Sequence, residues 1–279
     1  MKALETEHGE SELCRTFLVS RSGYYGWRKA QRKTPKTAQL DDEIREVYQK
    51  HRGRYGSPRV TRVLRQKAIP CSENRVARRM KVLGLAARKR KGYLPRTTDS
   101  RHGGPICANL LLGREQPSQP HQVWLSDLTY VATGEGWLYL VGFLDVATRR
   151  LVGWAVGETL EASLVCRGLH EARARCRPQK GLIIHSDRGS QYASGAYRQL
   201  LEEIRAVPSM SRRANCYDNA MMESFWSTLK AECFASHLPA TRREARTMIF
   251  EYIETYYNRV RLHSSLGYQC PMDFEAHLS

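Results

Sequence analysis

Three acidic residues stand out because each lies in or beside an apolar segment. Asp127 lies inside "WLSDLTY" and Asp187 ends "GLIIHSD", and both segments have the composition of buried strands. Glu223 lies in "CYDNAMMESFWSTLKAE", which has the apolar spacing of an amphipathic helix. Buried carboxylates are costly unless a cation or hydrogen-bond donors compensate them. Taken singly, each aspartate is explained at least as well as a turn or cap residue, so the hypothesis of chemistry depends on all three.

The two aspartates predict a metal site if their strands are neighbours. In that case both side chains project at one end of the sheet, a common place for ligands in α/β folds. Neither aspartate has an obvious Lys or Arg partner nearby in the sequence, so the two carboxylates repel each other. A hard divalent cation removes that repulsion, and oxygen ligands suit Mg²⁺ or Mn²⁺.

Glu223 lies at the border between the apolar and the polar side of its helix. Its neighbour on the wheel, Asn219, shares its flank. Asp218 precedes the helix as a possible N-cap, and Glu232, near the helix end, is interpreted as a surface residue. The apolar face that fixes the angle of this helix consists of Met222, Phe225, Trp226, Leu229 and Cys233.

The C-terminal half predicts the elements that would position these carboxylates. "QVWLSDLTYVA", "GWLYLVGFLDVATRR" and "LVGWAVGE" are predicted as three consecutive strands joined by tight turns. A helix in "ASLVCRGLHEARARC", the strand "GLIIHSD", a helix in "SGAYRQLLEEI", the strand "AVPSM" and the Glu223 helix follow. The order β-β-β-α-β-α-β-α predicts an α/β fold with a mixed five-stranded sheet flanked by helices. A further helix, "TRREARTMIFEYIETYYNRV", and a polar tail come after it.

The N-terminal half is predicted to be helical throughout. Residues 10–31 indicate two short helices around "VSRSG", residues 32–40 a linker and residues 41–85 further helices. In "GSPRVTRVLRQ", Ser57 is the expected N-cap and Pro58 the first helical residue. The break "KAIPCS" and the Arg-rich "ENRVARRMKVLGL" follow. A helix, a short break and an Arg-rich second helix are the layout of a helix-turn-helix.

Positive charge is concentrated in this helical region. The formal net charge is +17, and residues 51–100 hold 15 Lys or Arg against 2 Asp or Glu, whereas residues 101–150 hold 4 of each. Such a concentrated field suggests a polyanion, usually nucleic acid. A solvated basic surface is the alternative. The candidate DNA-contacting residues are Arg59, Arg62, Arg65, Arg75, Arg78, Arg79, Arg88, Lys89, Arg90 and Lys91, with Arg212, Arg213 and Lys230 beside the carboxylates.

Several classes of protein are disfavoured by composition. No apolar run approaches the roughly 18 residues of a membrane span, and "MKALETEHGE" is too polar for a signal peptide. The 8 cysteines form no CxxC pair and no Cys/His pattern with zinc spacing, so reduced thiols are expected. A cytoplasmic protein, associated with the nucleoid when bound to DNA and without a membrane partner, is the expectation.

The spacing of the three carboxylates and the sequence motifs around them together resemble a known family. Two aspartates and then a glutamate, with 35 residues between Asp187 and Glu223, are the order found in retroviral-integrase-like DDE transposases. "QVWLSDLTYV", "HSDRGSQY", "SMSRRANCYDNAMMESFWSTLKAE" and "YYNRVRLHSSLGYQCPMDF" are similar to the second-frame (OrfB) transposases of bacterial insertion sequences of the insertion-sequence-three type. "SRSGYYGWRK" and "RYGSPRVTRVLR" resemble the N-terminal part of those proteins, so the resemblance covers nearly the whole chain.

The resemblance implies a fold, a site and a cofactor. The fold is ribonuclease H-like, and Asp127, Asp187 and Glu223 match the metal-binding catalytic trio. Two Mg²⁺ ions are expected, with Mn²⁺ as a substitute, Asp127 as the shared ligand, Asp187 on one ion and Glu223 on the other. Residues that match positions near the family's active site are Ser186, Gly189, Gln191, Tyr192, Asn215 and Asn219.

The resemblance also implies an activity and partners. It implies metal-dependent nicking and strand transfer at insertion-sequence ends, on double-stranded end and target DNA, by a homo-oligomer. A companion first-frame protein, or a frameshift fusion with it, is expected. The rival hypotheses are a DNA-binding repressor with a non-catalytic ribonuclease H-like domain, a structure-selective nuclease on the same fold, and a non-enzymatic assembly protein. The expected domains are an N-terminal helical segment (1–36), a helix-turn-helix-like basic region (37–97), a linker (98–119), the catalytic core (120–235) and a C-terminal helical extension and tail (236–279).

Overall fold

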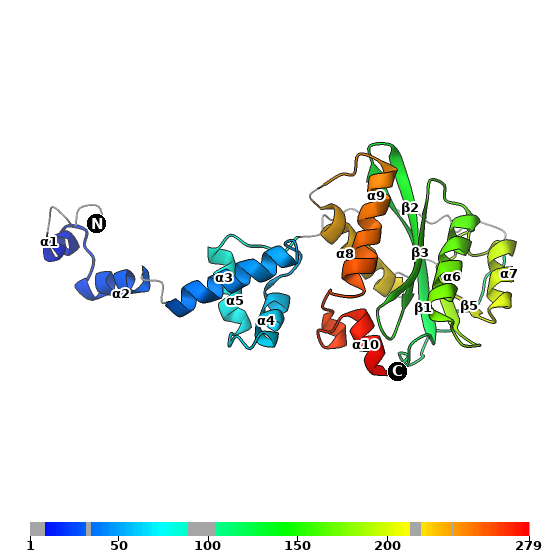
Figure 1. Cartoon of the computed structure of the whole chain (residues 1–279), viewed down its shortest axis with the longest axis horizontal. Coiled ribbons are helices and arrows are strands. Elements are labelled where there is room, and N and C mark those ends of the chain that lie inside the picture. Colours follow the sequence, from blue (N-terminus) through cyan, green and yellow to red (C-terminus); the bar gives the residue numbers. More distant parts are fainter. Residues whose placement is uncertain (1–8, 32–34, 89–103, 213–218, 236, 279) are drawn as a thin grey trace. The chain divides into compact units, whose positions relative to one another are not determined.

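The chain forms two compact units, Met1–Ala87 and Arg88–Ser279. The computed structural model describes residues 9–31, 35–88, 104–212, 219–235 and 237–278 (Figure 1). None of the helices in these ranges is long and apolar enough to cross a membrane.

The first unit is helical, as predicted. Its helices are α1 (Glu10–Thr16), α2 (Arg21–Gln31), α3 (Pro35–Lys50), α4 (Ser57–Gln66) and α5 (Glu73–Val82). Helices α3, α4 and α5 pack on one another. The buried residues between them are Ile44, Val47, Tyr55, Val60, Leu64, Val76 and Met80.

Two helix starts in this unit differ from the prediction. Helix α3 already begins at Pro35, so the linker predicted over residues 32–40 is wrong in its second half, because proline is well tolerated in the first turn of a helix. Gly56 rather than Ser57 is the N-cap of α4. At α5, Ser72 is the N-cap, and its hydroxyl accepts a hydrogen bond from the Arg75 N–H at 3.3 Å.

The second unit is built on the predicted mixed five-stranded sheet. Its strands are β1 (Val123–Thr133), β2 (Gly136–Asp145), β3 (Leu151–Gly157), β4 (Ile183–Ser186) and β5 (Val207–Met210), in the spatial order β3-β2-β1-β4-β5. The first three strands pair antiparallel, whereas β4 pairs parallel with both β1 and β5. Strands β1 and β4 are therefore neighbours, the condition on which the predicted metal site depends.

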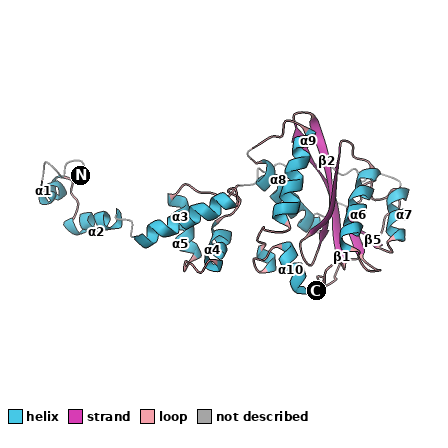
Figure 2. Cartoon of the chain, in the orientation of Figure 1, coloured by secondary structure: helices cyan, strands magenta, loops and turns pink. Residues whose placement is uncertain are grey.

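Helices cover both faces of this sheet (Figure 2). Helices α8 (Ala220–Phe234) and α9 (Arg242–Phe250) lie on one face, and α6 (Ala162–Cys176) and α7 (Gly195–Glu203) on the other. Alternate residues of β1 supply the two cores, since Leu125 packs with the α8 side and Trp124 with the α6 side. The fold is ribonuclease H-like, as the family resemblance implied.

The helix predicted over residues 241–260 packs on the same sheet, and the predicted polar tail after it contains two short helical elements. Helix α9 continues into a π-helical turn, Glu251–Tyr257, followed by a 3₁₀ turn, Ser264–Leu266, and helix α10, Pro271–Leu278. Tyr252, Ile253 and Tyr257 join the core beneath α8 and α9.

A buried ion pair fastens this segment to α8. Arg261, 3% exposed, donates to both carboxylate oxygens of Glu232 at 2.7–3.0 Å, and the Tyr252 hydroxyl donates to Glu232 at 2.9 Å. Glu232 is itself only 5% exposed. Its prediction as a surface residue is wrong, because an arginine 29 positions later in the chain compensates the buried charge.

Strand β3 forms one outer edge of the sheet, and two side chains cover parts of that edge. The Asn258 side chain accepts from the Leu151 N–H at 3.0 Å and donates to the Leu151 carbonyl at 3.1 Å. At the other end of the strand, the Arg167 guanidinium donates to the Val156 carbonyl at 3.3 Å. Both ends of the edge are thus occupied by side-chain hydrogen bonds.

Candidate active site

The sheet register brings Asp127 and Asp187 level with each other. The parallel pairing of β1 with β4 matches Val123 to Ile183 and Leu125 to His185. Continued by two residues, the same register sets Asp187, just past the end of β4, beside Asp127. Neighbouring strands lie about 4.8 Å apart and residues paired in this way face the same side. The two aspartates therefore share the sheet face that α8 covers.

Helix α8 brings Glu223 to the same region. The indole Nε1–H of Trp226 donates to Asp127 Oδ2 at 3.1 Å, which fixes α8 over the middle of β1. Glu223 lies one turn before Trp226 and is half-buried, at the predicted border between core and solvent. The predicted apolar face is confirmed, since Met222, Phe225, Trp226, Leu229 and Cys233 are all buried.

The electrostatics of Asp127 reflect this crowding. Burial, followed by the nearby negative charge of Asp187 and then that of Glu223, raises the pKa of Asp127 to about 8, while hydrogen bonds from the Leu128 backbone and from Trp226 oppose the rise. Asp187 and Glu223 therefore both lie close enough to Asp127 to disfavour its charged form.

A tight turn after β4 orients Asp187. Its Oδ1 accepts the Gly189 N–H at 2.9 Å. A Cβ on Gly189 would lie 2.9 Å from the Gln191 side-chain oxygen and 3.1 Å from Asp187 Oδ1, so a larger residue here would displace one or both of these side chains. Gln191 is held by its amide hydrogen bond to the Leu160 carbonyl at 3.1 Å. The Ser186 hydroxyl donates to the Asp187 carbonyl at 3.0 Å. Three of the predicted site-supporting residues, Ser186, Gly189 and Gln191, are thus grouped at one turn.

The remaining site-supporting residues surround this turn. The Tyr192 hydroxyl is 3.0 Å from that of Ser126 on β1, and burial raises its pKa well above the usual value. Asn219, at the N-cap position of α8, is 7% exposed, and its Oδ1 meets no hydrogen-bond partner within the described part of the chain. Asn215, Arg213 and the possible cap Asp218 lie outside the described residues.

The two described basic residues predicted beside the carboxylates differ in setting. Lys230, two turns after Glu223, has its ammonium 5.0 Å from the centre of the Tyr130 ring, and burial lowers its pKa. Arg212 is exposed. Their contacts with DNA stay a prediction.

The carboxylates fit divalent cations by their chemistry, because Mg²⁺ and Mn²⁺ prefer oxygen ligands and carry the charge that three neighbouring carboxylates lack. Within the ranges that the structure describes, no three His, Cys, Asp or Glu side chains are grouped as a ready metal cage. The fit therefore concerns the type of donor and the shared location of the three side chains.

The predicted DNA-contacting arginines of the first unit fall into two groups. Arg62, Arg65 and Arg78 are exposed on α4 and α5, whereas Arg59 and Arg75 are half-buried. Arg79 instead makes a two-pronged ion pair with buried Asp41, at 2.7 Å for each contact, so its environment indicates a structural role. Lys89, Arg90 and Lys91 lie outside the described residues, and Arg88, in the second unit, donates to the Glu232 carbonyl at 3.0 Å.

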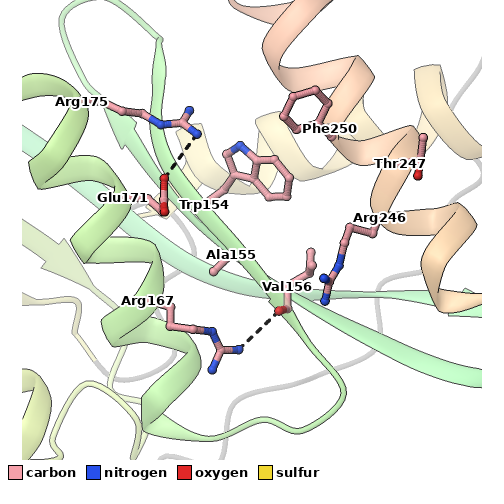
Figure 3. A pocket seen from close by; sticks show the side chains of 9 residues that line it. All are labelled: Trp154, Ala155, Val156, Arg167, Glu171, Arg175, Arg246, Thr247 and Phe250. Atoms are coloured by element: carbon pink, nitrogen blue, oxygen red, sulfur yellow. Dashed lines mark hydrogen bonds and ion pairs between the residues drawn. The ribbon is translucent and has the colours of Figure 1, made fainter.

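A groove of about 600 Å³ lies at the β3 edge (Figure 3). Arg175 pairs there with Glu171 at 3.5 Å, on the α6 side of the groove. None of the predicted site residues lines it, so we do not assign the chemistry to this groove. The lining residues are Trp154, Ala155, Val156, Arg167, Glu171, Arg175, Arg246, Thr247 and Phe250.

Sequence reasoning missed the contact that joins α8 to Asp127. The apolar face of α8 predicts the burial of Trp226 but not its hydrogen bond. Gly142 lies directly opposite Asp127 in the β1/β2 pairing, and an isolated glycine inside a strand indicates a close approach by another group. That glycine is the signal that could have revealed the contact.

Comparison with known protein families matches both units. A helix-turn-helix-like domain model matches residues 36–93, and two integrase core domain models match residues 117–216 and 205–271. The fold, the carboxylate-bearing face and these matches define an integrase-core protein preceded by a helix-turn-helix-like domain.

Relatives of known type match along almost the whole chain. An insertion element IS600 uncharacterized 31 kDa protein of Shigella sonnei is 44% identical over 94% of this chain and 97% of its own length. The transposase for insertion sequence element IS904 of Lactococcus lactis is 42% identical over 86% and 94%. Transposase InsF for insertion sequence IS3A of Escherichia coli is 35% identical over 97% and 95%. The chain belongs to the IS3-family transposases.

Proposed function

We propose that this transposase nicks and joins DNA strands at the ends of an insertion sequence, with Asp127, Asp187 and Glu223 as the catalytic residues. The observation that carries the proposal is their convergence. The β1/β4 register sets the two aspartates side by side, and the Trp226 bond to Asp127 brings the Glu223 turn of α8 over them. Such a cluster costs stability in a protein that does not use it.

The three carboxylates would hold divalent cations, with Mg²⁺ preferred and Mn²⁺ as a substitute. Asp127 is the proposed shared ligand because the charges of both other carboxylates act on it. When bound, two such cations activate the attacking oxygen and stabilise the leaving oxygen of a phosphodiester. The chain's own residues orient the ligands: the Gly189 N–H holds Asp187, and the buried face of α8 sets the direction of Glu223.

One site supports both reactions because only the nucleophile changes. Water as the nucleophile leaves a nick with a free 3′-OH. That 3′-OH, directed to the same site, then attacks a phosphodiester of the target DNA, and a new phosphodiester forms as the bond to the target's own 3′-oxygen breaks and that oxygen leaves as a 3′-hydroxyl. Lys230 and Arg212 are proposed to contact phosphates on either side of the scissile bond, where positive charge offsets the charge of the DNA backbone.

We propose that the helix-turn-helix-like unit binds the double-stranded ends of the element. The arginines Arg62, Arg65 and Arg78 support this assignment, because they are exposed on α4 and α5. We further propose that the protein acts as a homo-oligomer on DNA, in the cytoplasm at the nucleoid. It would act together with a companion first-frame protein or as a frameshift fusion with it.

The test is an assay with labelled element ends, target DNA and Mg²⁺, with and without the companion protein. Glu223→Gln and Asp187→Asn should bind the ends and yield neither nicks nor joined products. Glu202→Gln, at an exposed carboxylate on α7, is the matched control and should behave as wild type. End binding without any cleavage by the wild type would favour a repressor, and nicks without joined strands would favour a nuclease.

A further inference from the structure

Trp226 connects the two halves of the carboxylate cluster. Its side chain is 4% exposed, and its Nε1–H donates to Asp127 Oδ2 at 3.1 Å. Glu223 lies three residues earlier, within one helical turn and on the same flank of the helix. A single turn of α8 therefore carries one carboxylate of the cluster and a hydrogen bond to another.

Gly142 makes room for this contact. It pairs directly with Asp127 across β1 and β2, so a side chain at 142 would project from the same sheet face as Asp127. A Cβ there would lie 2.7 Å from Trp226 Cη2 and 3.1 Å from Cζ2. The indole thus occupies the space of the missing side chain, which lets its N–H reach the carboxylate beside it.

Aromatic packing fixes the indole in this position. The Phe225 ring lies 4.9 Å from the Trp226 ring and 4.8 Å from that of Tyr257, centre to centre. On the other side of Gly142, its pairing partner in β3 is Trp154, so aromatic residues extend from α8 to the edge strand. A purely hydrophobic role would not need an indole, because phenylalanine or leucine fills a core without bringing a buried N–H that requires a partner.

We propose that Trp226 is a positioning residue for Asp127, and that Gly142 is the residue that allows it to act. The inference rests on the proposed function, in which Asp127 is a metal-binding catalytic carboxylate. The indole N–H takes one lone pair of Oδ2, and together with the Leu128 backbone hydrogen bond it restricts rotation of the carboxylate, whose remaining lone pairs are left for a cation. Partners of this kind orient a ligand before the cation arrives.

The decisive variant is Trp226→Phe, which removes the N–H and keeps an aromatic ring. We expect the Mg²⁺ concentration that gives half-maximal nicking to rise on the order of 10-fold, as is usual when a partner of a metal ligand is removed. The Mg²⁺ concentration that gives half of the metal-induced rise in Tm, measured without DNA, should increase by a similar factor.

Trp124→Phe is the matched control. Trp124 is fully buried on the opposite face of β1, and its indole donates to His121 at 3.3 Å. Each of the two Trp→Phe substitutions therefore removes the same atoms and one part-buried indole hydrogen bond. Trp124→Phe should lower Tm without changing either Mg²⁺ midpoint. Unchanged midpoints in Trp226→Phe, or equal shifts in both variants, would overturn the proposal.

Gly142→Ala tests the same contact in a chain that keeps Trp226. Its methyl group should displace the indole and raise both Mg²⁺ midpoints, and it replaces Trp226→Phe as the deciding variant if that protein does not fold. A Gly142→Ala protein that folds and has wild-type midpoints would count against the proposal. A wild type that gains Tm with Mg²⁺ but cuts no DNA would refute the proposed function, and the Tm midpoints would still decide the role of Trp226.

Discussion

Replacing Asp127 with asparagine should stabilise the metal-free protein at alkaline pH. The pKa of Asp127 is raised from 3.8 to about 8 in the folded protein, so between these two values the folded state binds a proton that the unfolded state has lost. The stability of the wild type must therefore fall as pH rises through this window. An asparagine amide has the shape of the carboxyl group but no charge, so this loss should disappear in Asp127→Asn.

The magnitude follows from the shift and from the partial exposure of the site. A rise of about 4 pKa units corresponds to at most about 5–6 kcal/mol at about 1.36 kcal/mol per unit. Because Asp127 is only half-buried, solvent screening reduces this figure, and about 2 kcal/mol is the expected gain at pH 8. For a unit of this size, that gain is a rise in Tm of roughly 4–8 °C.

The assay is thermal unfolding in EDTA at pH 5 and pH 8, followed by tryptophan fluorescence. Four of the 5 tryptophans, all except Trp27, belong to the second unit, so the signal reports mainly on the unit that contains Asp127. Asp127→Asn should gain stability over the wild type at pH 8 and little at pH 5, and Mg²⁺ should stabilise only the wild type. Glu202→Gln is the control. A difference between Asp127→Asn and wild type that does not change with pH would refute the reasoning.

Three further predictions concern other parts of the chain. Arg261→Ala leaves the buried Glu232 charge unpaired and should cost about 3–5 kcal/mol of unfolding free energy, measured by urea denaturation. The double change Arg261→Met with Glu232→Leu should recover most of that loss. A loss below about 1 kcal/mol in Arg261→Ala would contradict the buried pair. Arg62→Ala should reduce the slope of log affinity for end DNA against log salt by about one. Arg79→Ala, through the loss of its Asp41 ion pair, should lower Tm more than Arg62→Ala does and leave that slope alone; the reverse pattern would exchange their roles. Gly189→Ala should reduce nicking about 10-fold by displacing Asp187, with Tm almost unchanged, and normal nicking would show that the turn tolerates a methyl group.

The elements around the carboxylates were predictable because local patterns determine them. The three strands before "ASLVCRGLHEARARC" alternate apolar residues between two covered faces, and the helical wheel of α8 places Glu223 at its border. Strand order does not follow from such patterns. Asp127 and Asp187 meet only because β1 and β4 are neighbours. That parallel pairing is seen in the structure and not in the local sequence pattern.

The error at Glu232 has a physical cause, which is a partner that is distant in the sequence. The exposure predicted for Glu232 is wrong because its buried partner, Arg261, belongs to a segment whose composition is that of a polar tail. Arg79 likewise lies among the arginines predicted to contact DNA, and its ion-pair partner Asp41 lies 38 positions away. Local charge patterns cannot distinguish an arginine that meets a phosphate from one that meets a buried carboxylate.

The hydrogen bonds of Asn258 and Arg167 along β3 bear on the solubility of this protein at high concentration. An open outer strand offers its backbone to any extended peptide, which is how many proteins begin to aggregate. Asn258 occupies both backbone groups of Leu151 just as an incoming strand would, and Arg167 occupies the Val156 carbonyl. A foreign strand would have to displace a side chain at each end before it could pair. Asn258 and Arg167 thus oppose fibre-like self-association through the β3 edge.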